Sequence, residues 1–114
     1  MDLQYSELSN NIRLIKLKGK LDITGTGEIE TVFAGYCGGE NVRVVVDVSE
    51  VDFLASIGIR LLTLTAKSVA SRGGRMVLLS PTPDVQHVLE ITGIPAMIPI
   101  YSNLESAETI LLAA

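Results

Sequence analysis

A single serine, Ser56, occupies a junction where its hydroxyl is a candidate for chemistry. The segment "DVSEVDFLASIGIRLL", residues 47 to 62, places it between a predicted buried strand and the start of a predicted helix. Unpaired backbone N–H groups and the helix dipole favour an anion at a helix N-terminus, so a phosphate carried by Ser56 would be tolerated there. The structural alternative is an N-cap serine, which accepts a backbone hydrogen bond and stabilises its helix by about 1 kcal/mol.

The rest of the sequence offers few of the residue types that a catalytic or metal site requires. A serine nucleophile needs a base, but His87 is the only histidine, and its helical position predicts that it faces solvent. The segment "LASIG" also lacks the first glycine of the G-x-S-x-G elbow. With one histidine and one cysteine, Cys37, the sequence predicts no enzyme, no metal site, no other cofactor and no internal disulfide. Cys37 is expected to be a small buried apolar residue.

Asp47 offers a second phosphate-accepting alternative, because it follows three buried valines as the aspartate of a phosphorelay receiver would. A receiver also needs paired acids after its first strand and a lysine after its last. The segments "LQYSELSN" and "IPIYSNL" supply neither arrangement. We therefore predict that Asp47 caps a turn after its strand.

Composition limits the class of protein. The 114 residues suit one domain, residues 1–114, and nine basic against thirteen acidic residues give a net charge of -4. The basic residues are scattered, so nucleic acid is not an expected partner. The start "MDLQYSELSN" resembles no leader, and no apolar stretch is long enough to span a membrane, which predicts a cytoplasmic protein without membrane contact.

The first half of the chain predicts two strands within residues 2–19, joined by a turn at residues 9–11. The apolar phase of the second strand shifts from Ile12 and Leu14 to Ile15 and Leu17, which indicates a bulge or burial on both faces. A helix follows and ends at the glycines after Cys37. "RVVVDV" predicts a strand covered on both faces, and a helix from Ser56 onward ends at residues 73–74. The inward stripe predicted for the first helix is Ile29, Val32, Phe33 and Tyr36.

The second half continues the alternation. "RMVLLS" predicts a strand, and "TPDVQHVLEITG" a helix with Thr82 as N-cap and Pro83 at its first position. "AMIPIYS" predicts a short strand at a sheet edge, because Pro99 cannot donate to a ladder. In "SNLESAETILL", Ser102 and Glu105 predict a capping box. The whole pattern predicts an α/β domain with a four- to five-stranded mixed sheet and about four helices packed against it.

The segment "VVVDVSEVDFLASIGIRLL" resembles the core signature of the STAS domain, the fold of bacterial anti-sigma factor antagonists. The resemblance extends to "IRLIKLKGKLD", "GGRMVLLSPTPDVQHVLEITGI" and "IPIYSNLESAETIL". It implies a protein that binds an anti-sigma factor, itself a serine kinase, and thereby releases a sigma factor. Phosphorylation at the position of Ser56 would switch this binding off, and a serine phosphatase would reset it. The chain is expected to be a monomer or a weak dimer.

The same resemblance implies a partner-binding surface around the serine. Its expected members are Asp22, Leu54, Ser56, Ile57 and Gly58, with neighbouring Phe53 a weaker candidate. In the family motif an acid precedes the serine and a second hydroxyl follows it, whereas this chain has Ala55 and Ile57. That departure leaves an alternative open, in which the domain is a non-phosphorylated scaffold or assembly subunit in a signalling complex.

Overall fold

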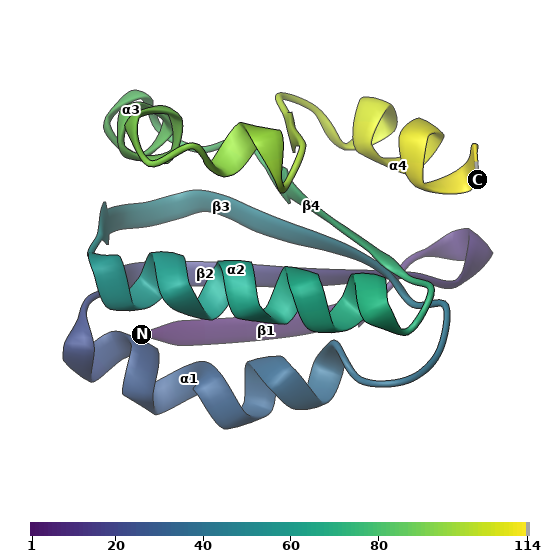
Figure 1. The fold of residues 1–114 in the computed structure, drawn as a ribbon, viewed down its shortest axis with the longest axis horizontal. Helices are drawn as coiled ribbons and strands as arrows, with labels where there is room; N and C mark the ends of the chain where they lie inside the picture. The colour runs from purple at the N-terminus through teal and green to yellow at the C-terminus, as the bar shows by residue number, and fades with distance from the viewer. Residues whose placement is uncertain (114) are drawn as a thin grey trace.

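A computed structural model describes residues 1–113 as a five-stranded mixed sheet flanked by four α-helices (Figure 1). This is the predicted fold class. The elements are β1 (Asp2–Glu7), β2 (Ile12–Leu21), α1 (Ile23–Tyr36), β3 (Arg43–Leu54), α2 (Ser56–Ser71), β4 (Arg75–Leu79), α3 (Pro83–Ile91), β5 (Ile100–Tyr101) and α4 (Leu104–Leu112), with short 3₁₀ turns η1 (Ser9–Asn11) and η2 (Ile94–Ala96).

The strands lie in the order β1-β2-β3-β4-β5. The β1–β2 pair is the predicted antiparallel hairpin, and the other pairs are parallel. The hairpin turns through Asn10 and Asn11, which adopt φ angles of 66° and 60°, a left-handed conformation that asparagine tolerates. β5 lies at the sheet edge, as predicted from Pro99. Because β2, β3 and β4 are parallel, their carboxyl ends lie at the same end of the sheet.

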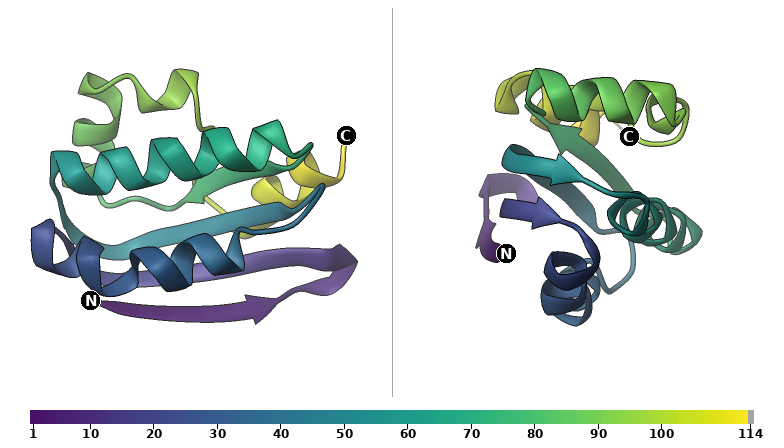
Figure 2. Two further views of the ribbon diagram at one scale, coloured as in Figure 1. Left: turned by 60° about the horizontal axis from the view of Figure 1, so that its bottom comes forward. Right: turned by 90° about the vertical axis from the view of Figure 1, so that its left-hand side faces the viewer.

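The sheet buries both of its faces, in two separate clusters. The larger cluster joins one face to α1, α2 and α3, and includes Phe33, Leu62 and Leu89. The smaller cluster joins the other face to α4, and includes Val45 and Leu111. Figure 2 shows α1 and α2 side by side along the sheet. The apolar phase shift within β2 is explained by this arrangement, since its residues contribute to both clusters: Ile12 and Leu14 on one face, Ile15 and Leu17 on the other.

β3 is longer than the sequence predicts. Asp47 lies inside the strand, so its prediction as a cap after the strand is wrong. Its carboxylate accepts a hydrogen bond from the Ser49 N–H at 2.9 Å, where β3 has an extra residue relative to β2. A second shift in register follows between Gly19 and Lys20 of β2. These bulges interrupt the alternation of β3 and carry the strand on to Leu54, directly before Ser56.

Local signals in the helices were predicted with mixed success. Thr82 caps α3 by accepting a hydrogen bond from the Val85 N–H at 3.3 Å, as predicted. The capping box at Ser102 is wrong, because Asn103 is the N-cap of α4 and accepts from the Ser106 N–H at 2.8 Å. Val32 is 51% exposed, since α1 turns Ile29 and Phe33 but not Val32 toward the sheet.

Two arginines fix the carboxyl end of α1. Arg13 Nη1 donates to the carbonyl oxygens of Tyr36 at 2.8 Å and Gly38 at 2.7 Å. Arg72 Nη2 donates to the carbonyl of Cys37 at 2.7 Å, and its Nε to that of Gly39 at 3.0 Å. The last carbonyls of a helix lack intrahelical partners and carry partial negative charge, so both guanidinium groups stabilise this end. We call it the clamped end.

Within residues 1–113, no helix has the length and apolar character needed to cross a membrane.

Candidate partner-binding site

Ser56 is the first residue of α2, and Ala55 occupies the N-cap position without a side-chain cap. The structural alternative, in which Ser56 is the N-cap, is therefore wrong by one residue. Its side chain is exposed and makes no hydrogen bond within the part of the chain that the structure describes. The preceding Ala55 N–H donates to the Leu21 carbonyl at 3.0 Å. The serine hydroxyl is consequently accessible at a helix start that is held to the end of β2.

The start of α1 lies at the same end of the sheet, because Leu21 pairs with Leu54 at the ends of β2 and β3. Asp22 is the N-cap of α1, and its Oδ1 accepts from the Gly25 N–H at 2.7 Å. The carboxylate is half-buried and caps α1, and the residue before it, Leu21, accepts the hydrogen bond from the Ala55 N–H that precedes Ser56. Figure 2 shows the two helix starts at one end of the molecule. We call this the open end.

Two members of the predicted surface are buried. Leu54 is only 7% exposed and belongs to the larger core cluster. Gly58 is also buried, and a Cβ placed there would lie 2.7 Å from the Leu21 Cβ and 2.9 Å from the Leu21 carbonyl oxygen. Their burial argues against the predicted partner contacts, because Leu54 supports the core and Gly58 lets α2 approach β2.

The open end nevertheless exposes apolar side chains. Ile57 is 38% exposed beside Ser56, and Phe53, at the end of β3, is 50% exposed. Ile23, at the start of α1, is 77% exposed and was not singled out from the sequence. It immediately follows Asp22 in a segment that carries turn signals, so no periodicity marked it. Exposed apolar groups from three elements at one end are typical of an interaction surface.

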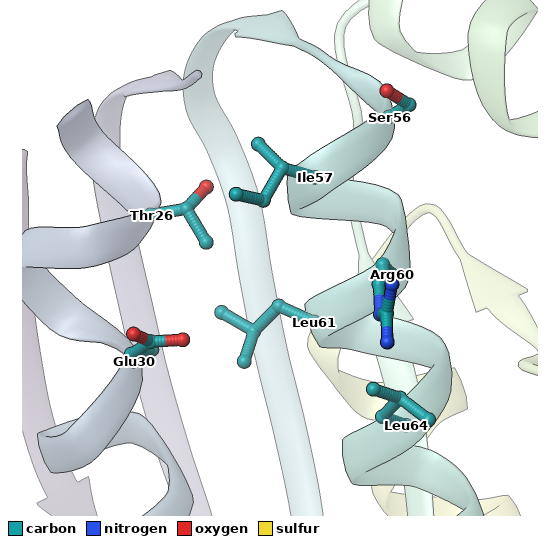
Figure 3. Close-up of a pocket in the computed structure, with 7 residues that line it drawn as sticks. All are labelled: Thr26, Glu30, Ser56, Ile57, Arg60, Leu61 and Leu64. Atoms are coloured by element: carbon teal, nitrogen blue, oxygen red, sulfur yellow. The ribbon is translucent and has the colours of Figure 1, made fainter. Parts of the chain in front are cut away.

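A groove of about 570 Å³ runs between α1 and α2 below Ser56. Figure 3 shows Thr26 and Glu30 of α1 facing Ile57 and Leu61 of α2 across it. The Thr26 hydroxyl is buried and has no hydrogen-bond partner among residues 1–113. The full lining consists of Thr26, Glu30, Ser56, Ile57, Arg60, Leu61 and Leu64.

Arg60 lines this groove one turn along α2 from Ser56. Its side chain is exposed and forms no ion pair or hydrogen bond with any other described residue. The spacing of four residues between Ser56 and Arg60 was visible in the sequence. What was not visible is that both side chains line the same groove.

Cys37 and His87 lie away from the groove. Cys37 is buried at the clamped end, and burial raises the pKa of its thiol to about 11, against the lowering influence of Arg13 and Arg72. His87 is exposed on α3, as predicted. Among residues 1–113, no group of three or more His, Cys, Asp and Glu side chains is arranged to hold a metal ion.

This architecture and the sequence both match a known family. The model of the STAS domain matches residues 6–107. The chain therefore belongs to the STAS domain family of bacterial anti-sigma factor antagonists. It is 30% identical over 91 residues to "Putative anti-sigma factor antagonist BtrV" of Bordetella bronchiseptica, a match that covers 80% of this chain and 78% of that protein.

Two solved structures extend the comparison. An anti-sigma-factor antagonist (STAS) domain protein from Planctomyces limnophilus superposes with a TM-score of 0.83 at 26% identity, covering 97% of this chain and 95% of that one. The Bacillus cell fate determinant SpoIIAA, in its phosphorylated form, has a TM-score of 0.69 at 18% identity, covering 96% of this chain and 99% of that one. The second comparison shows a common fold and no more.

Proposed function

We propose that this protein is an anti-sigma factor antagonist whose binding is switched off by phosphorylation of Ser56. In this proposal it binds an anti-sigma factor that is also a serine kinase, and thereby frees a sigma factor. The protein is a regulatory binding partner and a kinase substrate, and performs no catalysis itself. The observation that carries the proposal is the exposed, unbonded Ser56 hydroxyl at the start of α2, flanked by exposed Ile57 and Phe53.

The switching step is a phosphoryl transfer from ATP bound to the partner. The Ser56 oxygen forms a bond to the γ-phosphorus, the bond from that phosphorus to the β–γ bridging oxygen breaks, and ADP leaves. The hydroxyl proton passes to a base or water in the partner's active site. A phosphatase would reverse the modification by hydrolysis, giving serine and inorganic phosphate.

The physical effect of this step is larger at an interface than within the domain. A phosphate at the start of α2 meets unpaired N–H groups and the positive end of the helix dipole, which contribute about 0.3–1 kcal/mol in its favour. A phosphoserine carries a charge of about -1.5 to -2, and burying it against apolar groups without cations costs several kcal/mol. A loss of about 3 kcal/mol weakens binding more than a hundredfold. The domain keeps its fold while the partner dissociates.

The first experiment is phosphosite mapping by intact mass and peptide fragmentation, using protein from its own cells under growth and stress. The expected result is one phosphate on Ser56 whose occupancy changes with condition and which disappears in Ser56→Ala. The absence of phosphate in every condition would contradict the switch.

The second experiment identifies the partner. A photo-crosslinking residue replaces Ile57 in one variant and Leu112, which is 41% exposed on α4, in a matched control. We expect Ile57 to cross-link to an ATP-binding anti-sigma factor that phosphorylates wild-type protein in vitro but not Ser56→Ala. Equal cross-linking of that factor at both positions would contradict a docking surface at the open end.

Ala55 and Ile57 favour a second candidate function, a STAS scaffold that binds partners without being switched. These residues stand where the family motif usually has an acid and a second hydroxyl, and Ile57 is exposed. In this case Ile57 cross-linking to a partner persists while no condition produces a phosphate on Ser56. Mapping and cross-linking together therefore discriminate between the two functions.

A further inference from the structure

The groove between α1 and α2 brings the proposed phosphate acceptor next to a free cation. Ser56 and Arg60 both line it, and they are four residues apart on α2. Residues at this spacing lie on one face of a helix, with Cβ atoms about 5–6 Å apart. Figure 3 shows Arg60 between Ser56 and Leu64 along α2.

The direction of helical side chains strengthens this juxtaposition. Each Cα–Cβ bond tilts toward the helix N-terminus, so a long side chain covers the turn that precedes its own Cα. For Arg60 that turn contains Ser56, and because Figure 3 shows the guanidinium group extending toward Leu64, pairing requires a rotation of the exposed Arg60 side chain. The guanidinium group is exposed and unpaired among the described residues, so no existing bond must break before it can bind an anion.

We propose that Arg60 pairs within the same chain with the phosphate of phosphorylated Ser56 and holds it over the first turn of α2. This inference rests on the proposed function for its biological setting, because it concerns the phosphorylated form. The guanidinium group presents paired N–H donors that match two phosphate oxygens, so the contact fixes the orientation of the phosphate as well as its charge.

The pairing has a regulatory consequence. The second pKa of phosphoserine is about 6, so an isolated phosphate becomes partly protonated in mildly acidic surroundings. A nearby cation favours the dianion and lowers that pKa. Arg60 would thereby keep the phosphate doubly charged when the pH falls toward 6, so that the unbound state persists under acid conditions.

Other charged groups at the open end also influence the pKa of the phosphate. Glu30 lies across the groove on α1 and opposes the dianion, as does half-buried Asp22 at the start of α1. Lys20 and Asp52 are exposed near the ends of β2 and β3. All four are present in every variant compared below, so their contributions cancel.

The test uses full-length protein with phosphoserine incorporated genetically at position 56, which requires no kinase. The phosphate is titrated by phosphorus NMR in the parent protein and in Arg60→Gln, Arg60→Lys and Lys67→Gln. Lys67 is exposed on α2, eleven residues from Ser56, and matches the loss of one positive charge. Amide spectra of each variant verify the fold.

We expect the phosphate pKa to be about 0.5 lower in the parent than in Arg60→Gln, which is a threefold change in the acid dissociation constant. Solvent exposure of both groups screens the interaction and keeps the shift this small. Arg60→Lys should lie between them, and Lys67→Gln should match the parent. Equal values in the parent and Arg60→Gln would overturn the pairing. So would equal shifts in Arg60→Gln and Lys67→Gln, because net charge alone would then explain them.

The two proposals can fail separately. If mapping finds no phosphate on Ser56 in cells, the switch is rejected whatever the titration shows. If the titration shows no effect of Arg60 while mapping finds the phosphate, the switch stands and the pairing is rejected.

Discussion

The two ends of the α1–α2 layer use the same residue type in opposite ways. At the clamped end, Arg13 and Arg72 each donate two hydrogen bonds to carbonyls that follow or end α1. At the open end, Arg60 makes no such bond within residues 1–113. The difference follows from helix polarity. A helix carboxyl end presents unpaired carbonyls to a cation, whereas a helix start presents N–H groups, which suit an anion.

The comparison separates an end of the domain whose polar groups stabilise the fold from an end whose groups are exposed and available for binding. At the clamped end, arginine side chains bond the carbonyl oxygens of residues 36–39, and Cys37 is buried. Among residues 1–113, the open end leaves the exposed Ser56 hydroxyl and the Arg60 guanidinium without hydrogen-bond partners, and it exposes Ile23, Phe53 and Ile57. Groups without partners inside the fold are available to partners outside it.

The largest expected effect tests whether the open end is loosely packed beneath its surface. Gly58→Val would place a Cβ 2.7 Å from the Leu21 Cβ and 3.0 Å from the Leu54 Cδ1. We expect the free energy of unfolding to fall by about 3 kcal/mol through overpacking, measured by urea denaturation. Gly35→Ala, where the added Cβ meets no atom within 4 Å, should stabilise α1 by about 0.5–1 kcal/mol. Equal effects would show that the close approach to β2 is unimportant.

The next effect concerns the clamped end at alkaline pH. Burial raises the pKa of Cys37 from 9.0 to about 11 in the folded protein. Between these values the unfolded chain loses the thiol proton and the folded chain keeps it, so stability falls as the pH rises. We expect a loss of about 2–3 kcal/mol between pH 9 and 11 from this group. Cys37→Ala should remove this contribution to the pH dependence of the free energy of unfolding, measured by urea denaturation at each pH. The same pH dependence between pH 9 and 11 in wild type and Cys37→Ala would contradict the buried thiol.

A matched pair of substitutions tests the comparison directly. Arg13→Met removes two charge-assisted hydrogen bonds and should lower the free energy of unfolding by about 2 kcal/mol. Arg60→Met removes none and should change it by less than about 0.5 kcal/mol. Thermal and urea unfolding measure both. If Arg60→Met is as damaging as Arg13→Met, the two ends do not differ as described.

The smallest expected effect is at Thr26. Its buried hydroxyl has no partner among the described residues, so isosteric Thr26→Val should leave stability unchanged or raise it by up to about 1 kcal/mol. Thr65→Val, at a second buried threonine on α2, provides a control for the change in shape and β-branching. A clear loss of stability at Thr26 alone would mean that its hydroxyl is bonded within the fold.

Local patterns were sufficient for most of the fold. Thr82 before Pro83 predicted the start of α3, and Pro99 predicted an edge strand, because each depends on the backbone chemistry of one or two residues. The length of β3 was missed because its bulges break the alternation on which strand prediction depends.

The site was predicted less completely, for a tertiary reason. Ser56, Ile57 and Phe53 are exposed at the open end, but the burial of Leu54 and Gly58 depends on contacts that include Leu21, more than thirty residues earlier. The sequence did not indicate that Ile23 and Arg60 belong to this surface, because their positions depend on how α1 and α2 pack side by side. Family resemblance located the serine, whereas packing decided which neighbours reach solvent.

The end of β2 has a consequence for the kind of switch this domain can contain. Leu21 accepts the Ala55 N–H and packs beneath Gly58, while adjacent Asp22 caps α1, so the starts of both helices are tied to one pair of residues. Neither helix start can move far without disrupting the other. A ligand or modification shifts a conformational equilibrium only where two conformations compete. A phosphate on Ser56, as proposed, is therefore expected to act by changing the affinity of this surface, so the rate of switching would be set by the enzymes that add and remove it.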